Sequence, residues 1–418
     1  MARFSVGLFV AFAVWVSTTP VLSQGTGSGL ISQTAARRLG LHRAWFTQAE
    51  INHSQDRVVG MVLHQPAPKI DPDAPEGAEL PPIEPATLYV QSRRGVLQAI
   101  HAETGRTLWI RQVGRRNHIS ELPAANNEFV AVINGQILFL LDRRNGNFIW
   151  EHKLDVVPIA APAIGEEWVY VPTVSGRLRA HSLKDPTDYW NYGSEGPIRV
   201  QPLVIGNRIV WATDRGYLYV GDNREAAIDY RLETKKRIVA PATHFGVQAF
   251  VASRDGYVYA LELFSGVKSW RFSVGDPVSH SPIALNGRVY AISELGGMFS
   301  LSAKVGLKKW WSPNVGKFLA SSSKRLYVAD HRGGRMLVLD AESGARLNSL
   351  SMPRLDIRYI NTQTDRIYLA SSRGLVQCLR EFDLTEPLIH ALSTRPIVKP
   401  EVEDNGPGSG AGANPFGQ

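Results

Sequence analysis

The fold is decided by a stretch of fifteen residues, GVLQAIHAETGRTLW (residues 95–109), which returns as GYVYALELFSGVKSW (residues 256–270). In both copies the second glycine follows the first by ten positions, and four more positions lead to a tryptophan. The same frame fits eight times along the chain, with copies ending at positions 109, 150, 190, 230, 270, 310, 348 and 388. These positions are 38 to 41 residues apart, which predicts a protein built from repeats of about 40 residues.

Most of the repeats end on a large aromatic residue, and these are Trp109, Trp150, Trp190, Tyr230, Trp270 and Trp310. The last two copies end on Asn348 and Leu388 instead. Pro186 and Ala226 replace the second glycine in two copies, and the copy ending at 150 has one inserted residue. A large ring gains most from burial between neighbouring units, where its polar tip can also reach a carbonyl group. We therefore predict that the six aromatic residues dock one repeat onto the next.

Each repeat predicts four short antiparallel strands. Apolar residues alternate with a period of two on both sides of the first glycine, as in residues 208–211 and 217–220. Turns such as Arg-Asp-Gly before position 257 are typical of tight hairpins, in which glycine supplies the positive φ. Glycines inside every unit argue against paired-helix repeats. Sheets this small bury their faces only by packing on neighbours around a ring, so we predict a β-propeller with eight four-stranded blades over residues 41–390.

The start of the chain offers a way to close the ring. The run Leu41–Ile51 places Trp45 in a context like that of the repeat-ending tryptophans. We predict that residues 44–51 pair with the last blade as its outer strand, and that Arg57–His64 forms the innermost strand of the first blade. Such an exchange ties both ends of the propeller together and leaves no open sheet edge between them.

The segments outside the repeats differ in composition from the propeller. Arg3, an apolar run over residues 4–16 and small residues at 21–23 predict a signal peptide at 1–24, hence export to the periplasm or cell envelope. No cysteine stands at the cleavage site for lipid attachment, and no later stretch predicts a transmembrane helix. Residues 25–40 are expected to be a linker, 66–85 a Pro-rich acidic insert in the first blade, and 391–418 a disordered Pro/Gly-rich tail.

The charge pattern suggests a binding surface. The formal net charge is +8, although segments 66–85 and 391–418 are acidic, so the repeats carry the basic excess. Arginine doublets recur near the predicted turns, and a candidate basic rim comprises Arg93, Arg94, Arg115, Arg116, Arg143 and Arg144. A shared rim would attract acidic partners. Isolated doublets would be solvated loop residues that aid solubility.

The sequence carries no signature of an active site. The lone cysteine, Cys378, lies in an apolar run, which predicts a buried residue and excludes a disulfide within the chain or a multi-cysteine metal site. Asp214, Asp255 and Glu294 precede turn glycines, where such residues bond nearby backbone. There is no Ser-His-Asp signature, phosphate loop or HExxH motif, and the histidines fall at unlike positions in their repeats. We assign no catalytic, cofactor-binding or metal-binding residue.

Two segments resemble the tryptophan-docking repeat of the quinoprotein-like (PQQ-repeat) propellers: Glu-Thr-Gly-x-x-x-Trp, which ends at Trp109, and Ser-Gly-x-x-x-Trp, which ends at Trp270. The resemblance extends over residues 86–390. That family has eight blades and includes pyrroloquinoline-quinone dehydrogenases and non-enzymatic propellers such as the outer-membrane assembly protein BamB. If the chain is one of the dehydrogenases, the resemblance implies that PQQ and calcium bind in the central channel. The vicinal disulfide common in those enzymes is impossible with one cysteine.

The sequence therefore predicts a non-catalytic, exported scaffold rather than an enzyme. We expect it to bind envelope or outer-membrane proteins through a propeller face, with a role in outer-membrane protein assembly, and to be monomeric without a nucleic-acid partner. The alternative is a PQQ-dependent quinoprotein dehydrogenase, and only this alternative requires PQQ with calcium. A carbohydrate- or peptidoglycan-associated propeller is a third hypothesis, which the sequence neither supports nor excludes.

Overall fold

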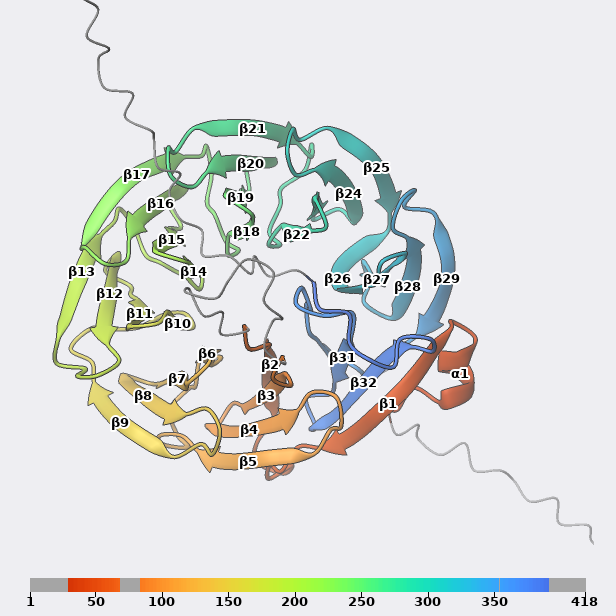
Figure 1. Ribbon diagram of the computed structural model, residues 1–418, viewed down its shortest axis with the longest axis horizontal. Coiled ribbons are helices and arrows are strands. Elements are labelled where there is room, and N and C mark those ends of the chain that lie inside the picture. The colour runs from red at the N-terminus through yellow and green to blue at the C-terminus, as the bar shows by residue number, and fades with distance from the viewer. Residues whose placement is uncertain (1–28, 68–82, 353, 391–418) are drawn as a thin grey trace, which may run out of the picture.

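The computed structural model is a ring of small sheets arranged around a central axis (Figure 1). It describes residues 29–67, 83–352 and 354–390. These residues form eight sheets, each of four antiparallel strands. In seven blades the strands follow one another outward from the axis in chain order, and in the eighth the first strand of the chain takes the outermost place (Figure 1). The predicted all-β, eight-bladed propeller is confirmed.

From the axis outward, the first blade consists of β2 (Val58–His64), β3 (Thr87–Ser92), β4 (Val96–His101) and β5 (Thr107–Gln112), and the second of β6 (Ala124–Ala125), β7 (Phe129–Asn134), β8 (Ile137–Asp142) and β9 (Phe148–Lys153). The third blade consists of β10 (Ala163–Ile164), β11 (Trp168–Pro172), β12 (Arg177–Ser182) and β13 (Tyr189–Gly193), and the fourth of β14 (Leu203–Ile205), β15 (Arg208–Ala212), β16 (Tyr217–Asp222) and β17 (Ala227–Glu233).

In the same order, the fifth blade consists of β18 (Thr243–Phe245), β19 (Gln248–Ala252), β20 (Tyr257–Glu262) and β21 (Lys268–Ser273), and the sixth of β22 (Ile283–Leu285), β23 (Arg288–Ile292), β24 (Gly297–Ser302) and β25 (Lys308–Pro313). The seventh blade consists of β26 (Val315–Ser321), β27 (Arg325–Asp330), β28 (Arg335–Asp340) and β29 (Arg346–Ser351), and the eighth of β30 (Ile357–Arg358), β31 (Ile367–Ala370), β32 (Leu375–Glu381) and β1 (Leu41–Gln48).

The core lies between the blades. The second strand of a blade is covered on both sides by its neighbours, and β3 is buried along its whole length. The outer strands are covered on one side only, and in β21 buried Trp270 stands among exposed or half-buried residues. Apolar clusters therefore span blade boundaries: one joins Val210 and Leu218 of the fourth blade to Val251 and Leu261 of the fifth. Each blade depends on both neighbours for its burial.

The eighth blade is completed by the start of the chain. Strand β1 lies outside β32, antiparallel to it, with Leu41 opposite Glu381 and Gln48 opposite Leu375. The N-terminal strand in red and the C-terminal strand in blue lie side by side in Figure 1. The closing strand is that expected from the sequence, shifted toward the N-terminus, and β2 is the innermost strand of the first blade.

One boundary expectation needs correction. Residues 29–40, expected to be linker, contain the helix α1 (Gln33–Arg37), whose Ala36 is buried against the last two blades together with Leu39. The predicted signal peptide (1–24), most of the 66–85 insert and the 391–418 tail lie outside the described residues.

In the described part of the chain, no helix is long and apolar enough to cross a membrane.

Candidate protein-interaction surface

The repeat-ending aromatic residues sit at the boundaries between blades. Trp109, Trp150, Trp270 and Trp310 each donate the indole N–H to a backbone carbonyl of the next blade, at 2.8 to 3.2 Å. The Tyr230 hydroxyl reaches the Glu262 carbonyl at 3.0 Å. Trp45 of β1 makes the same contact with Ala102, so it is the docking residue of the eighth blade.

In the five repeats that carry a second glycine, this residue makes room for the ring that docks from the preceding blade. A Cβ added to Gly306 would lie 2.6 Å from Cδ2 of Trp270, and one added to Gly105 would lie 2.6 Å from Trp45. Gly146, Gly266 and Gly344 are crowded in the same way by the aromatic residues of the preceding blades. At these five boundaries the repeat therefore pairs an aromatic residue with a glycine of the next blade, not with one of its own blade.

Trp190 departs from this arrangement. It is half-buried and lies against Trp168 of its own blade, with ring centroids 3.9 Å apart and the ring planes tilted by 34°, and its indole N–H has no partner among the described residues. Buried Tyr192 instead donates its hydroxyl to the Asp222 carbonyl of the fourth blade, at 2.5 Å. That blade has Ala226 where the glycine would stand, so the usual space for a docked ring is missing there.

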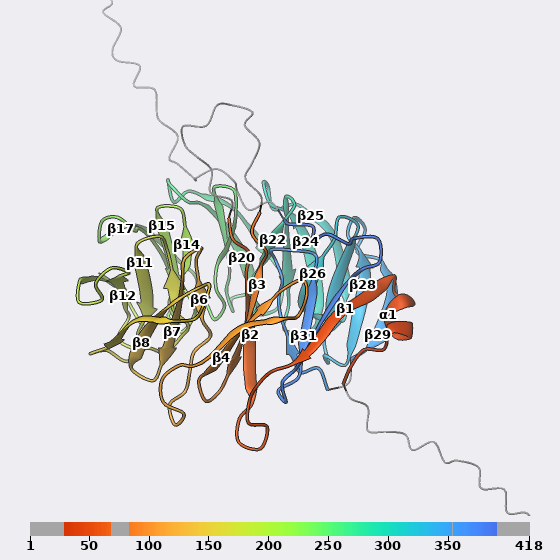
Figure 2. The same ribbon diagram turned by 60° about the horizontal axis from the view of Figure 1, so that its bottom comes forward.

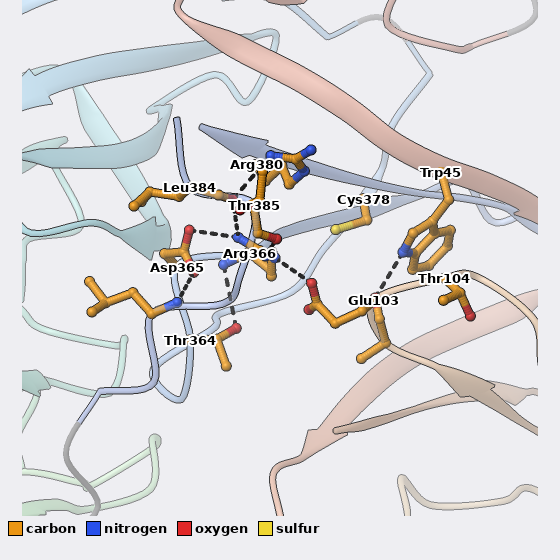
Figure 3. A network of polar contacts seen from close by, with 12 residues as sticks. Trp45, Glu103, Thr104, Thr364, Asp365, Arg366, Cys378, Arg380, Leu384 and Thr385 are labelled. Carbon is orange, nitrogen blue, oxygen red and sulfur yellow. Dashed lines mark hydrogen bonds and ion pairs between the residues drawn. The ribbon is translucent and has the colours of Figure 1, made fainter. Parts of the chain in front are cut away.

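A buried ion network joins the eighth blade to the first (Figure 3). The side chain of Arg366 is fully buried and donates to Glu103 of the first blade, at 2.8 Å, and to Asp365, at 2.9 Å. Its remaining donors reach the carbonyls of Leu384 and Thr385, at 3.2 and 2.8 Å. Burial raises the pKa of both carboxyl groups, and the guanidinium opposes that shift. The network therefore locks the ring where the two ends of the propeller meet.

The lone cysteine belongs to the same region and is chemically quiet. Cys378 is fully buried in β32, and burial raises the pKa of its thiol well above the usual value. A thiol held in the protonated form is a poor nucleophile.

The antiparallel strands give the propeller two different faces (Figure 2). The turns between second and third strands, together with the connections from blade to blade, lie on one face, which we call the turn face. The turns between third and fourth strands, where the aromatic rings dock, lie on the other, which we call the docking face. The position of a residue within the repeat therefore decides the face that it occupies.

The predicted basic rim is divided between these faces. Arg93 and Arg94 lie in the β3–β4 turn, and Arg115 and Arg116 lie in the connection from β5 to β6, so all four share the turn face and are exposed. Arg144 is exposed, but it lies in the β8–β9 turn on the docking face together with Arg143.

Arg143 does not belong to any exposed rim. It is 6% exposed, donates to the Asn127 carbonyl at 2.8 Å and pairs with Glu84 at 2.5 Å. Its own carbonyl accepts the indole N–H of Trp109. Arg143 therefore has a structural role, and the predicted rim is reduced to the four arginines of the turn face. The signal that separates them is their place in the repeat: Arg93 and Arg94 precede a first glycine, whereas Arg143 and Arg144 precede a second.

The turn face as a whole is basic. Among described residues outside the strands, its exposed basic residues are Arg57, Arg93, Arg94, Arg115, Arg116, Arg199, Arg215, Lys235, Lys236, Arg237, Arg332, Arg354 and Arg373. Its exposed acids are Glu50, Asp155, Glu195 and Asp356. On the docking face the same comparison gives ten acids, among them Glu166, Glu167 and Glu225, against eight basic residues. The turn face is thus the surface suited to an acidic partner.

The carboxylates near the turn glycines serve the turns themselves. Asp255 accepts the backbone N–H groups of Tyr257 and Lys235 and the hydroxyl of Tyr259. Asp214 pairs with Arg199 at 3.1 Å, and Glu294 pairs with Arg254 at 3.2 Å. Within the described ranges, no group of three or more His, Cys, Asp or Glu residues is placed to hold a metal ion.

One buried histidine should make stability depend on pH. His181 is fully buried, shares a hydrogen bond between Nδ1 and the Pro186 carbonyl at 2.7 Å, and packs against the rings of His152 and Tyr189. Burial lowers its pKa from 6.5 to about 4. The imidazole is therefore neutral in the folded protein but takes up a proton near pH 6.5 once unfolded. Its contribution to stability is complete above pH 6.5 and is lost as the pH falls toward 4.

We expect this single group to remove about 2 kcal/mol of unfolding free energy between pH 7 and pH 4.5. Urea titrations at both pH values, on the wild type and on His181→Gln, measure the effect. The variant should lose less stability on acidification than the wild type. Equal losses would show that His181 does not titrate as described.

The chain is similar to one family throughout most of its length. A family model described as outer membrane protein assembly factor BamB matches residues 51–244 and 233–366. A curated relative of that name from Moranella endobia is 22% identical over 261 residues, which cover 55% of this chain and 66% of the relative. Another from Yersinia pestis is 20% identical over 288 residues, covering 63% of this chain and 64% of the relative. The alignments thus span slightly less than two thirds of these relatives.

Solved structures support the architecture. The crystal structure of BamB from Moraxella catarrhalis has a TM-score of 0.61 and 17% sequence identity, and the match covers 77% of this chain and 98% of that one. The computationally designed Ika8 protein has a TM-score of 0.59 at 11% identity, covering 79% and 98%. At these identities the likeness shows the propeller fold alone.

Proposed function

The chain belongs to the family of the outer membrane protein assembly factor BamB, and from this membership we propose that it is a non-catalytic binding scaffold for outer-membrane protein assembly. The family match carries the proposal, because it extends from the loop before the first blade to the eighth blade. It therefore covers the first seven blades and the innermost strand of the eighth.

The architecture suits this role. A closed ring of interlocked blades holds two broad sets of loops in fixed positions, and such loops commonly carry binding residues. The basic turn face offers one contact surface for other envelope proteins, while the docking face has a different charge. We propose that the protein acts as a monomer in the periplasm or cell envelope, exported by the signal segment, and that its partners are proteins rather than nucleic acid.

The alternative, a quinoprotein dehydrogenase, has less support. An enzyme of that kind needs several oxygen ligands for calcium beside the quinone. Asp214, Asp255 and Glu294 are the carboxylates that the sequence offered, and each is engaged by nearby donors. The family model and the curated relatives from Moranella endobia and Yersinia pestis are described as outer membrane protein assembly factor BamB, not as dehydrogenases. We accordingly propose that no cofactor is required.

The proposal predicts which proteins accompany the chain. An affinity-tagged full chain, expressed in the organism that produces it, should capture outer-membrane assembly proteins from detergent-solubilised envelopes, identified by mass spectrometry after chemical crosslinking. The same tag on an unrelated exported propeller is the control. Capture of no such protein, or of an equal amount by the control, would contradict the scaffold role. Dye reduction by the chain after addition of PQQ and calcium would favour the enzyme instead.

A further inference from the structure

Five arginines gather on the turn face where the first blade meets the second. They are Arg57, Arg93, Arg94, Arg115 and Arg116, all exposed, and we call them the arginine patch. The Arg93 N–H donates to the Arg57 carbonyl at 2.9 Å. Gln112 links the other two segments, since its amide donates to the Arg94 carbonyl at 2.7 Å and accepts from Nε of Arg116 at 3.4 Å. Three separate loops are thus tied into one surface.

No carboxylate of the described chain neutralises the patch. Buried Asp56 lies beneath it, but its carboxylate accepts the backbone N–H groups of Arg57 and Arg94, at 2.8 and 3.1 Å, rather than a guanidinium. The guanidinium groups of Arg94 and Arg116 contact only the neutral amides of Gln55 and Gln112 among the described residues.

Two other basic residues of the same face are paired within the chain. Arg199 pairs with Asp214 at 3.1 Å, and Arg254 pairs with Glu294 at 3.2 Å. Gathering five positive charges that have no ion-pair partner in the described part of the chain costs free energy through repulsion, and an anionic ligand would relieve that cost. Arginine also binds carboxylates through two parallel hydrogen bonds, which gives such a contact a defined geometry.

The surroundings of the patch include apolar side chains. Ile119, in the same connection as Arg115 and Arg116, is 64% exposed, and Val59, next to Arg57, is 44% exposed. Strand β2 and this connection pack directly on each other, because a Cβ added to Gly60 would lie 2.7 Å from Cδ2 of Leu122. An apolar contact surrounded by charged groups is the usual composition of a protein–protein interface.

We propose that the arginine patch docks an acidic segment of a protein partner, whose Asp and Glu side chains pair with the guanidinium groups while an apolar side chain packs on Ile119. This inference rests on the proposed function, since it names the chemistry of a partner of the scaffold. A local patch with apolar neighbours fits a protein segment better than a lipid surface, which would contact the whole face.

The test uses a fluorescein-labelled dodecapeptide of Asp and Glu with one central leucine, and its Asn/Gln counterpart. Binding to the full chain is followed by anisotropy at low and physiological salt. Arg94→Glu/Arg116→Glu should weaken binding of the acidic peptide about tenfold or more, with a smaller salt dependence. The matched control, Arg332→Glu/Arg373→Glu, makes the same charge change at exposed positions of the same face, in the seventh and eighth blades, and should change binding less than about twofold.

Equal weakening by both variants would overturn the patch, because it would show attraction by the whole face. Binding of the neutral peptide as tight as that of the acidic one would also overturn it. Patch-dependent binding to phosphatidylglycerol vesicles without binding of the acidic peptide would replace the protein partner by a lipid surface.

Envelope capture separates the two proposals. If the wild type and Arg94→Glu/Arg116→Glu retain assembly proteins equally, the patch proposal fails and the scaffold role stands. If the wild type retains none, the scaffold role fails, whatever the peptide shows.

Discussion

Trp270→Ala is expected to lower the free energy of unfolding by about 3–5 kcal/mol. The ring is 9% exposed and fills the boundary between the fifth and sixth blades, where it lies over Gly306 and near Phe250. Its indole N–H bonds the Ala303 carbonyl at 2.8 Å, so truncation leaves both a cavity and an unpaired acceptor. Chemical denaturation followed by circular dichroism measures the loss.

A neighbouring tryptophan provides the control for this experiment. Trp311 stands beside the docking residue Trp310 in β25, but it is 52% exposed. Trp311→Ala removes the same side chain and should cost less than about 1 kcal/mol. Similar losses for the two variants would mean that the docked rings do not hold the blades together.

Arg366→Met is expected to cost a similar amount, about 3–5 kcal/mol, because it leaves the buried carboxylates of Glu103 and Asp365 without their cation. Methionine keeps most of the side-chain volume, so the loss reports charge and hydrogen bonding rather than a cavity. Adding Glu103→Gln and Asp365→Asn removes the buried negative charges and should restore part of the lost stability. Thermal and urea unfolding of the single and triple variants measure both effects.

An exposed ion pair is the appropriate comparison. Arg231 and Glu195 are 2.6 Å apart, and both side chains are about half exposed. Arg231→Met should change stability by less than about 1 kcal/mol. If Arg366→Met costs no more than this variant, the network does not lock the ring.

The repeat predicted the blades because its aromatic residue and its second glycine form a contact that recurs between neighbouring blades. A docked ring needs a residue without a side chain opposite it, so the two positions change together across a boundary. Trp190 precedes the repeat with Ala226, and Asn348 precedes the repeat with Leu384. Trp150 shows the limit of this rule, since it still bonds the Leu183 carbonyl in the blade that has Pro186.

The remaining differences come from contacts that sequence spacing does not encode. Tyr192 lies on the same side of its strand as Trp190, two residues further on, and it is Tyr192 that is buried and bonds to the next blade. Arg143 is the right residue type for a basic rim, but Glu84 and Asn127 from other segments enclose it. The Arg366 network joins residues 263 positions apart, and no local pattern connects them.

The candidate interaction surface was partly predictable. Four of the six predicted rim arginines lie together on the turn face, because Arg93 and Arg94 precede a first glycine and Arg115 and Arg116 lie in a connection between blades. Arg57 was missed because it stands alone before the first inner strand, without a second arginine beside it. Whether a charged loop residue is neutralised depends on neighbouring blades, as the pair Arg199 and Asp214 shows, and only the folded ring reveals that.

The scaffold role is tested most directly in cells from which the gene has been deleted. The quantity to measure is the fraction of outer-membrane β-barrel protein that reaches its folded, heat-modifiable form. Deletion should lower that fraction, and the wild-type gene should restore it. The Arg94→Glu/Arg116→Glu gene should restore less than the Arg332→Glu/Arg373→Glu gene at equal protein levels. An unchanged folded fraction in the deletion strain would contradict a role in outer-membrane protein assembly.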